Sequence, residues 1–304
     1  MAYRHKLILR SLVVGGVLVA LALVAVWWSS WSDPLQTVGS YAGERWNGSG
    51  LHIPFRWCPV GTFMMGSPVT EAGHGDDEDQ VSVTLSRGFW LGETEVTQGQ
   101  WQSVMGTTPW KGEDWVNDGS KYPATHVSHS GDDDSAEEFC RRFTAREKAA
   151  GRLPEGWVYR LPTESEWEYA CRAGTTTAYS CGDDSSKLGS YAWTEENSRS
   201  ELASEWWLAS HDLYAHPVGL KRANAWGLRD MHGNVWEWCR DGYDEKLPGG
   251  TDPENTTGAS SRVYRGGCWL YAPARCRSAF RSSFAPKYRS RNLGFRIARS
   301  QSRQ

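Results

Sequence analysis

Alternating apolar and polar positions predict a set of short strands. The segment VSVTL at 81–85 alternates with period two, as a half-buried strand does. Residues 55–66 alternate more weakly and are expected to form the first strand. Gly88 closes a turn after 81–85, so residues 89–96 are predicted to pair with that segment in a hairpin. Later strands are predicted at 262–265, 277–284 and 294–298.

Three short helices are predicted from residues that favour a helix N-terminus. Thr97 is expected to start the first helix, and Ser135 the second, which should end at Gly151. Thr163 is expected to start the third helix, which stops near Gly174. Ser135 and Thr163 each precede a glutamate by three positions, which is the pattern of a capping box. The apolar residues expected to be buried on these helices are Trp101, Met105, Ala136, Phe139, Cys140, Phe143, Trp167, Ala170 and Cys171.

Much of the remaining chain is predicted to be loop. Residues 106–132 and 175–260 show no confident periodicity and are rich in turn formers. A packed domain holds loops of this length only when something ties them down. The available ties are metal ions, disulfides and the packing of 18 tryptophans. Seven cysteines is an odd number, so at least one thiol is unpaired or serves another purpose.

The charge balance argues against nucleic acid as a partner. Lys plus Arg (33) nearly matches Asp plus Glu (36), which gives a net charge of −3. Nucleic-acid binding depends on a basic surface field, and this composition provides none.

The N-terminus predicts a membrane anchor. Residues 11–28 are apolar over a length at the lower end of what spans a bilayer as a helix. The basic residues of 1–10 precede this run and none follows it directly, so 1–10 is expected to be a cytoplasmic tail. Residues 29–54 are expected to be a linker to a domain at 55–300 in the periplasm or on the cell surface. A cleaved signal peptide is the alternative, although no clear small-x-small cleavage motif follows the run.

The segment 224–241 concentrates candidate chemistry. It holds three tryptophans and, between them, Asp230, Gly233, Asn234 and Glu237. Gly and Asn tolerate the left-handed backbone that kinks a loop, and calcium takes carboxylate and carbonyl oxygens from such loops. The simpler interpretation is a tight turn in which Asp230 caps the backbone and Glu237 faces solvent.

This segment resembles the signature of the formylglycine-generating enzyme family, also called sulfatase-modifying factors. The stretches that carry the resemblance, in chain order, are GTFMMGSP (61–68), GFWLGETEVTQGQW (88–101), RLPTESEWEYACRAG (160–174), GLRDMHGNVWEW (227–238), RGGCW (265–269) and NLGFR (292–296). The resemblance implies an α+β, loop-rich fold related to C-type lectins, placed after the N-terminal transmembrane helix.

The resemblance also implies one or two calcium ions. One site corresponds to the side chains of Asp230 and Glu237 with the carbonyls of Gly233 and Val235. The other corresponds to Asn197 and the Ser198 carbonyl with Asp212 and the Tyr214 carbonyl. The alternative for the second set is that Asn197 and Asp212 cap turns.

The catalytic pattern of the family is incomplete in this chain. The family's active enzymes bind copper(I) between two cysteines five positions apart, as suits a soft ion. The corresponding positions here are Tyr271 and Cys276, so copper is not expected. Cys268 and Cys276 are the remaining candidates for an altered site, and a disulfide from Cys276 to Cys171 is the simpler alternative. The residues that correspond to the substrate groove are Tyr271, Arg275, Asn292 and Arg296.

Two functions follow from this comparison. The first is a noncatalytic or altered-chemistry module that binds a protein or glycan in the family groove. The second is an oxidoreductase that uses a metal and oxygen to convert a cysteine or serine of a client protein, such as a sulfatase, to formylglycine. Tyr271 favours the first, and the length of the family resemblance favours the second.

Overall fold

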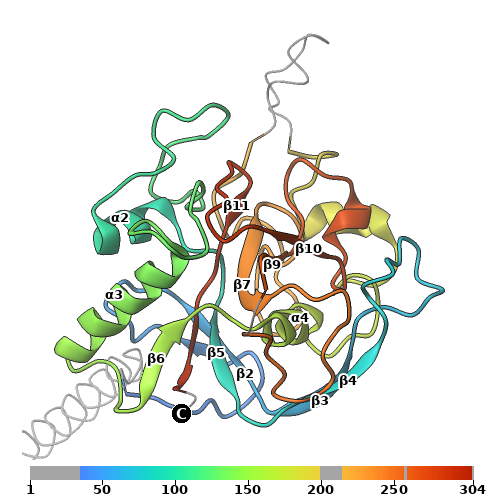
Figure 1. Ribbon diagram of the computed structural model, residues 1–304, viewed down its shortest axis with the longest axis horizontal. Helices are drawn as coiled ribbons and strands as arrows, with labels where there is room; N and C mark the ends of the chain where they lie inside the picture. The colour runs from blue at the N-terminus through green and yellow to red at the C-terminus, as the bar shows by residue number, and fades with distance from the viewer. Residues whose placement is uncertain (1–34, 199–213, 257–258, 303–304) are drawn as a thin grey trace, which may run out of the picture.

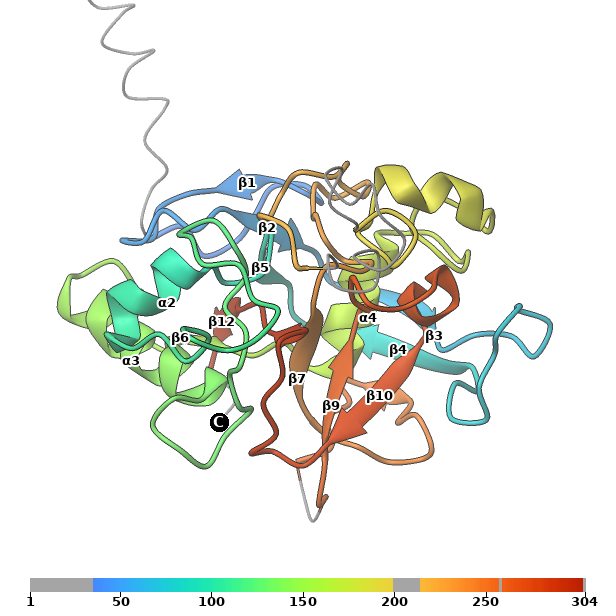
Figure 2. The same ribbon diagram turned by 90° about the horizontal axis from the view of Figure 1, so that it is seen from above.

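The computed structural model describes residues 35–198, 214–256 and 259–302. Within these ranges no helix is long and apolar enough to cross a membrane, and the predicted anchor at 11–28 lies outside them. The described chain forms a mixed fold of three small sheets and few helices, joined by long loops (Figures 1 and 2).

The largest sheet is antiparallel and has the strand order β1-β2-β5-β12-β6. Its first strand lies in the segment predicted as a linker, where the buried Trp46 joins the domain core. Its central strand, β5, has four buried residues, because sheet neighbours flank it and the core covers it. The strand bounds are β1 Arg45–Trp46, β2 Phe55–Cys58, β5 Phe89–Gly92, β12 Ala298–Gln301 and β6 Trp157–Arg160.

A second sheet has the order β10-β9-β7-β11 and carries the segment of candidate chemistry. Strand β7 lies within the region 175–260, which the sequence analysis predicted to be loop, so that prediction was wrong there. Six of its seven residues are buried, so it lacks the clean alternation that marks a half-exposed strand. The bounds are β7 Trp236–Gly242, β9 Arg262–Arg265, β10 Arg281–Phe284 and β11 Leu293–Gly294.

The third sheet has the order β3-β4-β8 and overturns the predicted hairpin. The predicted first strand divides at Pro59, which lacks a backbone N–H, into β2 and β3. Strand β4 pairs with β3, whereas β5 pairs with β2, so the two segments expected to form a hairpin belong to different sheets. The bounds are β3 Gly61–Met65, β4 Val81–Leu85 and β8 Gly250–Thr251.

The three predicted α-helices are confirmed. They are α2 (Gln98–Met105), α3 (Ala136–Ala149) and α4 (Glu164–Arg172). Thr97 and Thr163 each form a full capping box, while Ser135 caps α3 through its side chain alone. Two 3-10 helices also occur, η1 (Ser185–Ser190) and η2 (Pro273–Cys276).

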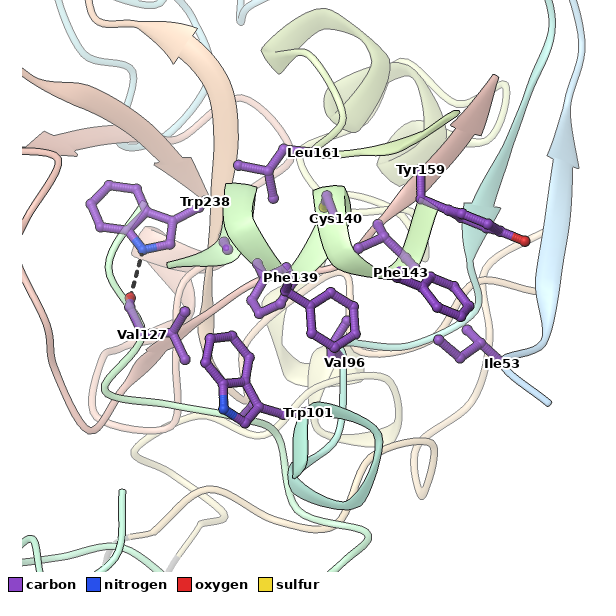
Figure 3. Close-up of a cluster of buried hydrophobic side chains, with 14 of the residues drawn as sticks. Ile53, Val96, Trp101, Val127, Phe139, Cys140, Phe143, Tyr159, Leu161 and Trp238 are labelled. Atoms are coloured by element: carbon purple, nitrogen blue, oxygen red, sulfur yellow. Dashed lines mark hydrogen bonds between the residues drawn. The ribbon is translucent and has the colours of Figure 1, made fainter. Parts of the chain in front are cut away.

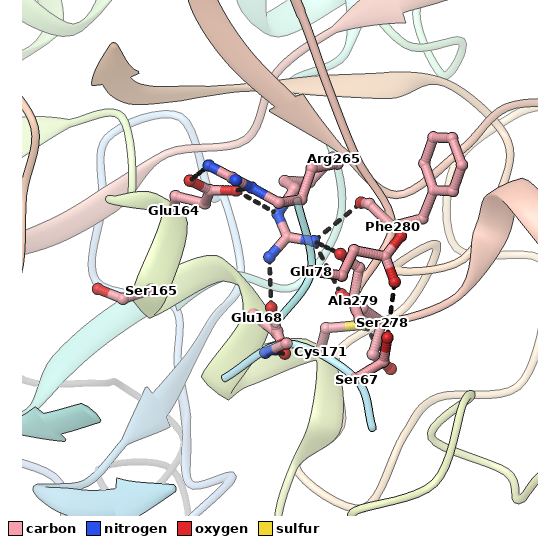
Figure 4. A network of polar contacts seen from close by, with 12 residues as sticks. Ser67, Glu78, Glu164, Ser165, Glu168, Cys171, Arg265, Ser278, Ala279 and Phe280 are labelled. Atoms are coloured by element: carbon pink, nitrogen blue, oxygen red, sulfur yellow. Dashed lines mark hydrogen bonds and ion pairs between the residues drawn. The ribbon is translucent and has the colours of Figure 1, made fainter. Parts of the chain in front are cut away.

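The interior differs between the two sides of the domain. Around α3 it is apolar and aromatic, and the Trp101 ring stacks on Phe139 at 5.7 Å (Figure 3). Around α4 it is crossed by ion pairs centred on Arg265, whose side chain is fully buried (Figure 4). Both regions contact the second sheet, through Trp238 and Arg265, and so hold β7 and the loop before it in place.

Candidate functional site

The loop that enters β7 is a tight left-handed turn. Asp230, Gly233 and Asn234 have φ values of 57°, 78° and 60°. A Cβ on Gly233 would lie 2.1 Å from the Trp193 carbonyl oxygen, so only glycine fits there. The side chain of Asn234 is held at both ends: its Nδ2 donates to Glu95 at 2.9 Å, and its Oδ1 accepts from the His216 backbone at 2.9 Å. The kinked loop expected from the sequence is therefore present.

Three buried carboxylates lie around this turn: Glu95, Asp230 and Glu237. Burial raises the pKa of Glu95 well above its usual range, and the charges of Asp230 and Glu237 raise it further. Burial raises the pKa of Asp230 to about 6. One oxygen of Glu95 (Oε2) and one of Asp230 (Oδ1) accept no hydrogen bond from an N–H or hydroxyl group of the described residues, and the two carboxyl groups are close enough to share a proton. Either a shared proton or a bound cation would satisfy these buried oxygens.

The side chain of Glu237 has partners that the sequence-based interpretations did not include. Arg296 donates to both of its carboxylate oxygens, from Nε and Nη2, at 2.6 Å each. Trp167 Nε1 donates to the same carboxylate at 2.8 Å. The simpler interpretation placed Glu237 in solvent, but the side chain is fully buried. Its oxygens fit a structural ion pair better than a calcium ligand, because the guanidinium already neutralises them.

Glu95 is the residue that sequence reasoning missed at this site. It lies 139 positions from Asn234 and reaches the turn only through the tertiary fold. The raised pKa of Glu95 means that this side chain holds a proton in the absence of an ion, so a divalent cation would bind here only by displacing that proton. Glu95, Asp230 and Glu237 would then carry three negative charges against the one positive charge of Arg296. Within the described ranges no group of three His, Cys, Asp or Glu side chains is arranged to hold a metal. An ion here therefore needs backbone oxygens beside Asp230 and Glu95, such as the expected carbonyls of Gly233 and Val235.

The second expected calcium set is only partly described. Asp212 lies outside the described residues. The side chain of Asn197 organises a turn: its Oδ1 accepts from the Thr194 backbone at 2.9 Å, and its Nδ2 donates to the Ala192 carbonyl at 2.9 Å. Tyr214 contacts Trp115, with ring centroids 6.4 Å apart. Ser198 is buried, and its hydroxyl has no partner among the described residues.

The position of the first copper ligand in the family is taken by an aromatic cluster. The Tyr271 ring packs against Trp236 with centroids 5.9 Å apart. Arg275 is exposed, and its guanidinium lies over the Tyr271 ring, 4.7 Å from the ring centroid. The phenol ring thus fills the place of a thiolate and is held there by packing and a cation–π contact.

The remaining thiols do not form a substitute copper site. Cys276 is buried in an apolar cluster, where desolvation raises the pKa of its thiol well above the ordinary value. Burial also raises the pKa of Cys268 to about 12, and Asn292 Nδ2 lies 3.2 Å from its sulfur. Thiolates are the species that bind soft metals, and Tyr271 leaves one thiol where the family's copper site has two. The residues present therefore do not fit the two-thiolate copper(I) site of the family.

No disulfide ties the loops together. All seven cysteines fall within the described residues and all are free. Cys171, an expected partner of Cys276, instead lies near His232 Nε2 at 3.7 Å and Ser278 Oγ at 3.6 Å. The loops are fixed by tryptophan packing, by buried ion pairs and by the glycine-dependent turns.

The expected groove residues separate into two groups. Tyr271, Arg275 and Asn292 lie around the turn between β9 and η2, and all three are at least partly exposed. Arg296 does not belong with them, because its side chain is fully buried against Glu237. The resemblance assigned the whole NLGFR motif (292–296) to the groove, and the alternative for this motif was a core segment with Arg296 in a salt bridge, which is what the structure shows for Arg296.

Comparisons with known proteins place this chain in a family. Residues 55–301 match the family described as the sulfatase-modifying factor enzyme 1-like domain. The chain is 29% identical over 283 residues to the formylglycine-generating enzyme of Streptomyces coelicolor, covering 79% of this chain and 87% of that one. It is 30% identical over 246 residues to the chaperone protein LppX of Paenibacillus barcinonensis, covering 72% and 82%.

A solved structure agrees with these relatives. PvdO from Pseudomonas aeruginosa matches with a TM-score of 0.69 and 25% identity, over 86% of this chain and all of that chain. The chain therefore belongs to the sulfatase-modifying factor family, as the sequence motifs indicated.

Proposed function

We propose that this protein is a membrane-anchored, extracytoplasmic member of the family that binds a client protein without oxidising it. The observation that carries the proposal is Tyr271, which packs against Trp236 at the position of a copper-binding cysteine. The second thiol, Cys276, is buried with a raised pKa. A client-binding role is also consistent with a relative that is named a chaperone.

The binding surface in this proposal is formed by Tyr271, between β9 and η2, by Arg275 in η2, and by Asn292, which precedes β11 and contacts Cys268. Arg275 is exposed, and its guanidinium is ordered by the Tyr271 ring and, at 5.9 Å, by Phe280. Ordered arginines and aromatic rings are the side chains that most often anchor a protein partner. Calcium, held by Asp230 and Glu95, would stabilise the loop that supports this surface.

A second candidate is formylglycine formation, which the 29% identity to the Streptomyces coelicolor enzyme favours. It requires a metal centre different from the paired thiolates of the family, for which Cys268 and Cys276 are the candidate thiols. Their burial as neutral thiols counts against it.

The deciding experiment is an aldehyde assay. Purified full-length protein is incubated with copper(I), oxygen and a Cys-x-Pro-x-Arg peptide, with the Streptomyces coelicolor enzyme as the positive control. We expect no aldehyde by mass spectrometry or hydrazide capture. Aldehyde formed by the wild type would overturn the noncatalytic proposal.

A matched variant sharpens this test. Tyr271→Cys restores two cysteines at the family spacing, and we expect it to gain copper(I) in a chromophoric chelator competition that the wild type fails. If the wild type takes up as much copper(I) as the variant, Tyr271 does not prevent copper(I) binding.

A further inference from the structure

Two segments of the described domain that meet at one hollow carry exposed apolar side chains. Four of the nine exposed large hydrophobic residues come from two segments: Leu35, Val38 and Tyr41 from the first, and Val60 from the turn between β2 and β3. Their exposed fractions are 49%, 64%, 67% and 59%. We call this surface the Val38 face. Clustered apolar exposure of this kind marks a contact surface more often than scattered single residues do.

The first segment is fixed to the domain, so its exposure is a feature of the fold. Trp90 Nε1 donates to the Thr37 carbonyl at 3.2 Å, and the Gly43 backbone N–H donates to the Trp57 carbonyl at 2.9 Å. Gly39 lies so close to the Trp57 ring that an added Cβ would be 2.3 Å from it. The chain is therefore held flat against the largest sheet while Val38 and Tyr41 point outward.

A hollow of about 870 Å³ continues the Val38 face. Val38, Val60 and the buried rings of Trp57 and Phe89 line part of it. The charged side chains along its border are Arg87, Glu155, Arg160, Glu166 and Asp252, of which Arg160 and Glu166 form an ion pair. The two arginines and three carboxylates leave an excess of one negative charge, so the hollow is mixed in character and its exposed apolar side chains are Val38 and Val60.

The chain itself limits how far this face can lie from a bilayer. If residues 11–28 span the membrane, seven Cα–Cα steps separate Trp28 from Leu35. A fully extended chain covers about 25 Å in that number of steps. Because the segment from Leu35 onward is packed onto the domain, the tether keeps the Val38 face within reach of the membrane surface.

We infer that the Val38 face rests on the lipid surface of the membrane that anchors the chain. Val38, Tyr41 and Val60 would enter the interfacial region, as apolar and amphipathic aromatic side chains do. The inference depends on the anchoring part of the proposed function. It has a consequence for that function: β2, β3 and the C-terminus lie at one end of the molecule and β11 at the other, so the surface beside Asn292 faces away from the bilayer (Figure 1).

The test uses the full-length protein in nanodiscs. Cys181 is the one half-exposed thiol and the other six are buried, so Cys181→Ser gives a background without a reactive thiol. A fluorophore is attached in turn through Val38→Cys and Val60→Cys. The matched controls are Val69→Cys and Leu220→Cys, at positions that are 77% and 62% exposed and do not line the hollow. The discs carry a lipid with a spin-label quencher near the headgroup.

The expected result is loss of most of the fluorescence at positions 38 and 60, with little loss at 69 and 220. Equal quenching at all four positions, or none at 38 and 60 while the protein stays with the disc, overturns the inference and leaves the anchor intact. Protein that does not co-elute with the discs overturns the anchor and the inference together. Unchanged quenching at 38 after Val60→Asp and Tyr41→Asp are combined would also count against apolar insertion.

Discussion

Around α3 the interior is built from aromatic rings, whereas around α4 it is built from paired charges. Phe143 and Tyr159 pack with centroids 4.3 Å apart in the first region. In the second, Arg265 contacts Glu168 and lies 3.1 Å from Glu164, and Arg172 lies 2.8 Å from Glu168. Apolar packing depends mainly on volume and tolerates substitutions that conserve it. A buried ion pair depends on both partners, and the loss of one leaves a charge without compensation.

The comparison explains how a chain with long loops keeps one structure. The aromatic region joins regular elements, with α3 packed on β6 of the largest sheet and α2 packed on α3. The ion-paired region also fixes loops: Arg277, directly after η2, lies 2.6 Å from Glu71 and 2.8 Å from Glu78, both in the loop between β3 and β4. Directional contacts suit loops, because a loop has no repeating apolar face to bury. The sequence analysis expected metals or disulfides in this role, and buried arginines perform much of it.

The largest effect is expected from Arg265→Ala. Removing the guanidinium leaves Glu164 and Glu168 with one cation each and unpairs three backbone carbonyls that it contacts. We expect a loss of about 4 kcal/mol in the free energy of unfolding, measured by urea denaturation. The control is Arg141→Ala, which removes a solvent-exposed ion pair and should leave the midpoint unchanged. Equal effects of the two substitutions would remove the distinction between the regions.

The aromatic region should respond to volume instead. Phe139→Ala is expected to cost about 3 kcal/mol, because it opens a cavity between Trp101 and Phe295. Phe139→Leu keeps most of the volume and should cost about 1 kcal/mol. Urea denaturation of both variants gives the two losses in the free energy of unfolding, which can then be compared. A leucine variant as unstable as the alanine variant would mean that this region is as geometrically demanding as the ion-paired one.

Calcium should stabilise the turn before β7, where carboxylates lack a full set of cations. An ion bound only by the folded state adds about 2.7 kcal/mol at a concentration 100 times its Kd. We expect chelator to lower the Tm of the wild type, and Asp230→Asn or Glu95→Gln to abolish this response. Glu237→Gln should lower the Tm with and without calcium, because its partner is Arg296. If the calcium response is lost in Glu237→Gln but kept in Glu95→Gln, then Glu237 and not Glu95 binds the ion.

The dependence of stability on pH is expected to have opposite signs in the two regions. Burial, and then the charge of Glu164, raise the pKa of Asp241 to about 7 from an ordinary value near 3.8. The folded protein thus binds a proton more tightly than the unfolded chain, so stability falls as pH rises from about 4 to about 7, by at most about 1.4 kcal/mol per pH unit. Asp241→Asn should remove this slope in urea denaturation at a series of pH values.

His129, which contacts Trp238 in the aromatic region, should act the other way. Burial lowers its pKa to about 3 from 6.5, so its contribution to stability is lost as pH falls from about 6.5 toward 3. His129→Gln is the matched variant. If the slopes of stability against pH change in the same direction in Asp241→Asn and His129→Gln, the assignment of opposite signs is contradicted.

Local sequence alone determined the three α-helices and the two strands β4 (81–85) and β9 (262–265) of this protein. The capping box predicted at Thr163 is present, the one predicted at Ser135 is reduced to a side-chain cap, and Thr97, expected only as an N-cap, forms a full box with Gln100. The alternation of 81–85 likewise marks a strand by itself, but not its partner. The split at Pro59 shows the limit, because weak alternation on both sides of it resembled one strand.

Only the tertiary structure decided the contacts that define the candidate site. Glu95 meets Asn234 across 139 positions, and Arg296 meets Glu237 across 59. Periodicity and motif spacing report on neighbours along the chain, whereas the pairing of buried charges depends on which loops the sheets bring together. Tyr271 could be identified from the sequence as a missing thiolate, yet its packing against Trp236 followed only from the fold.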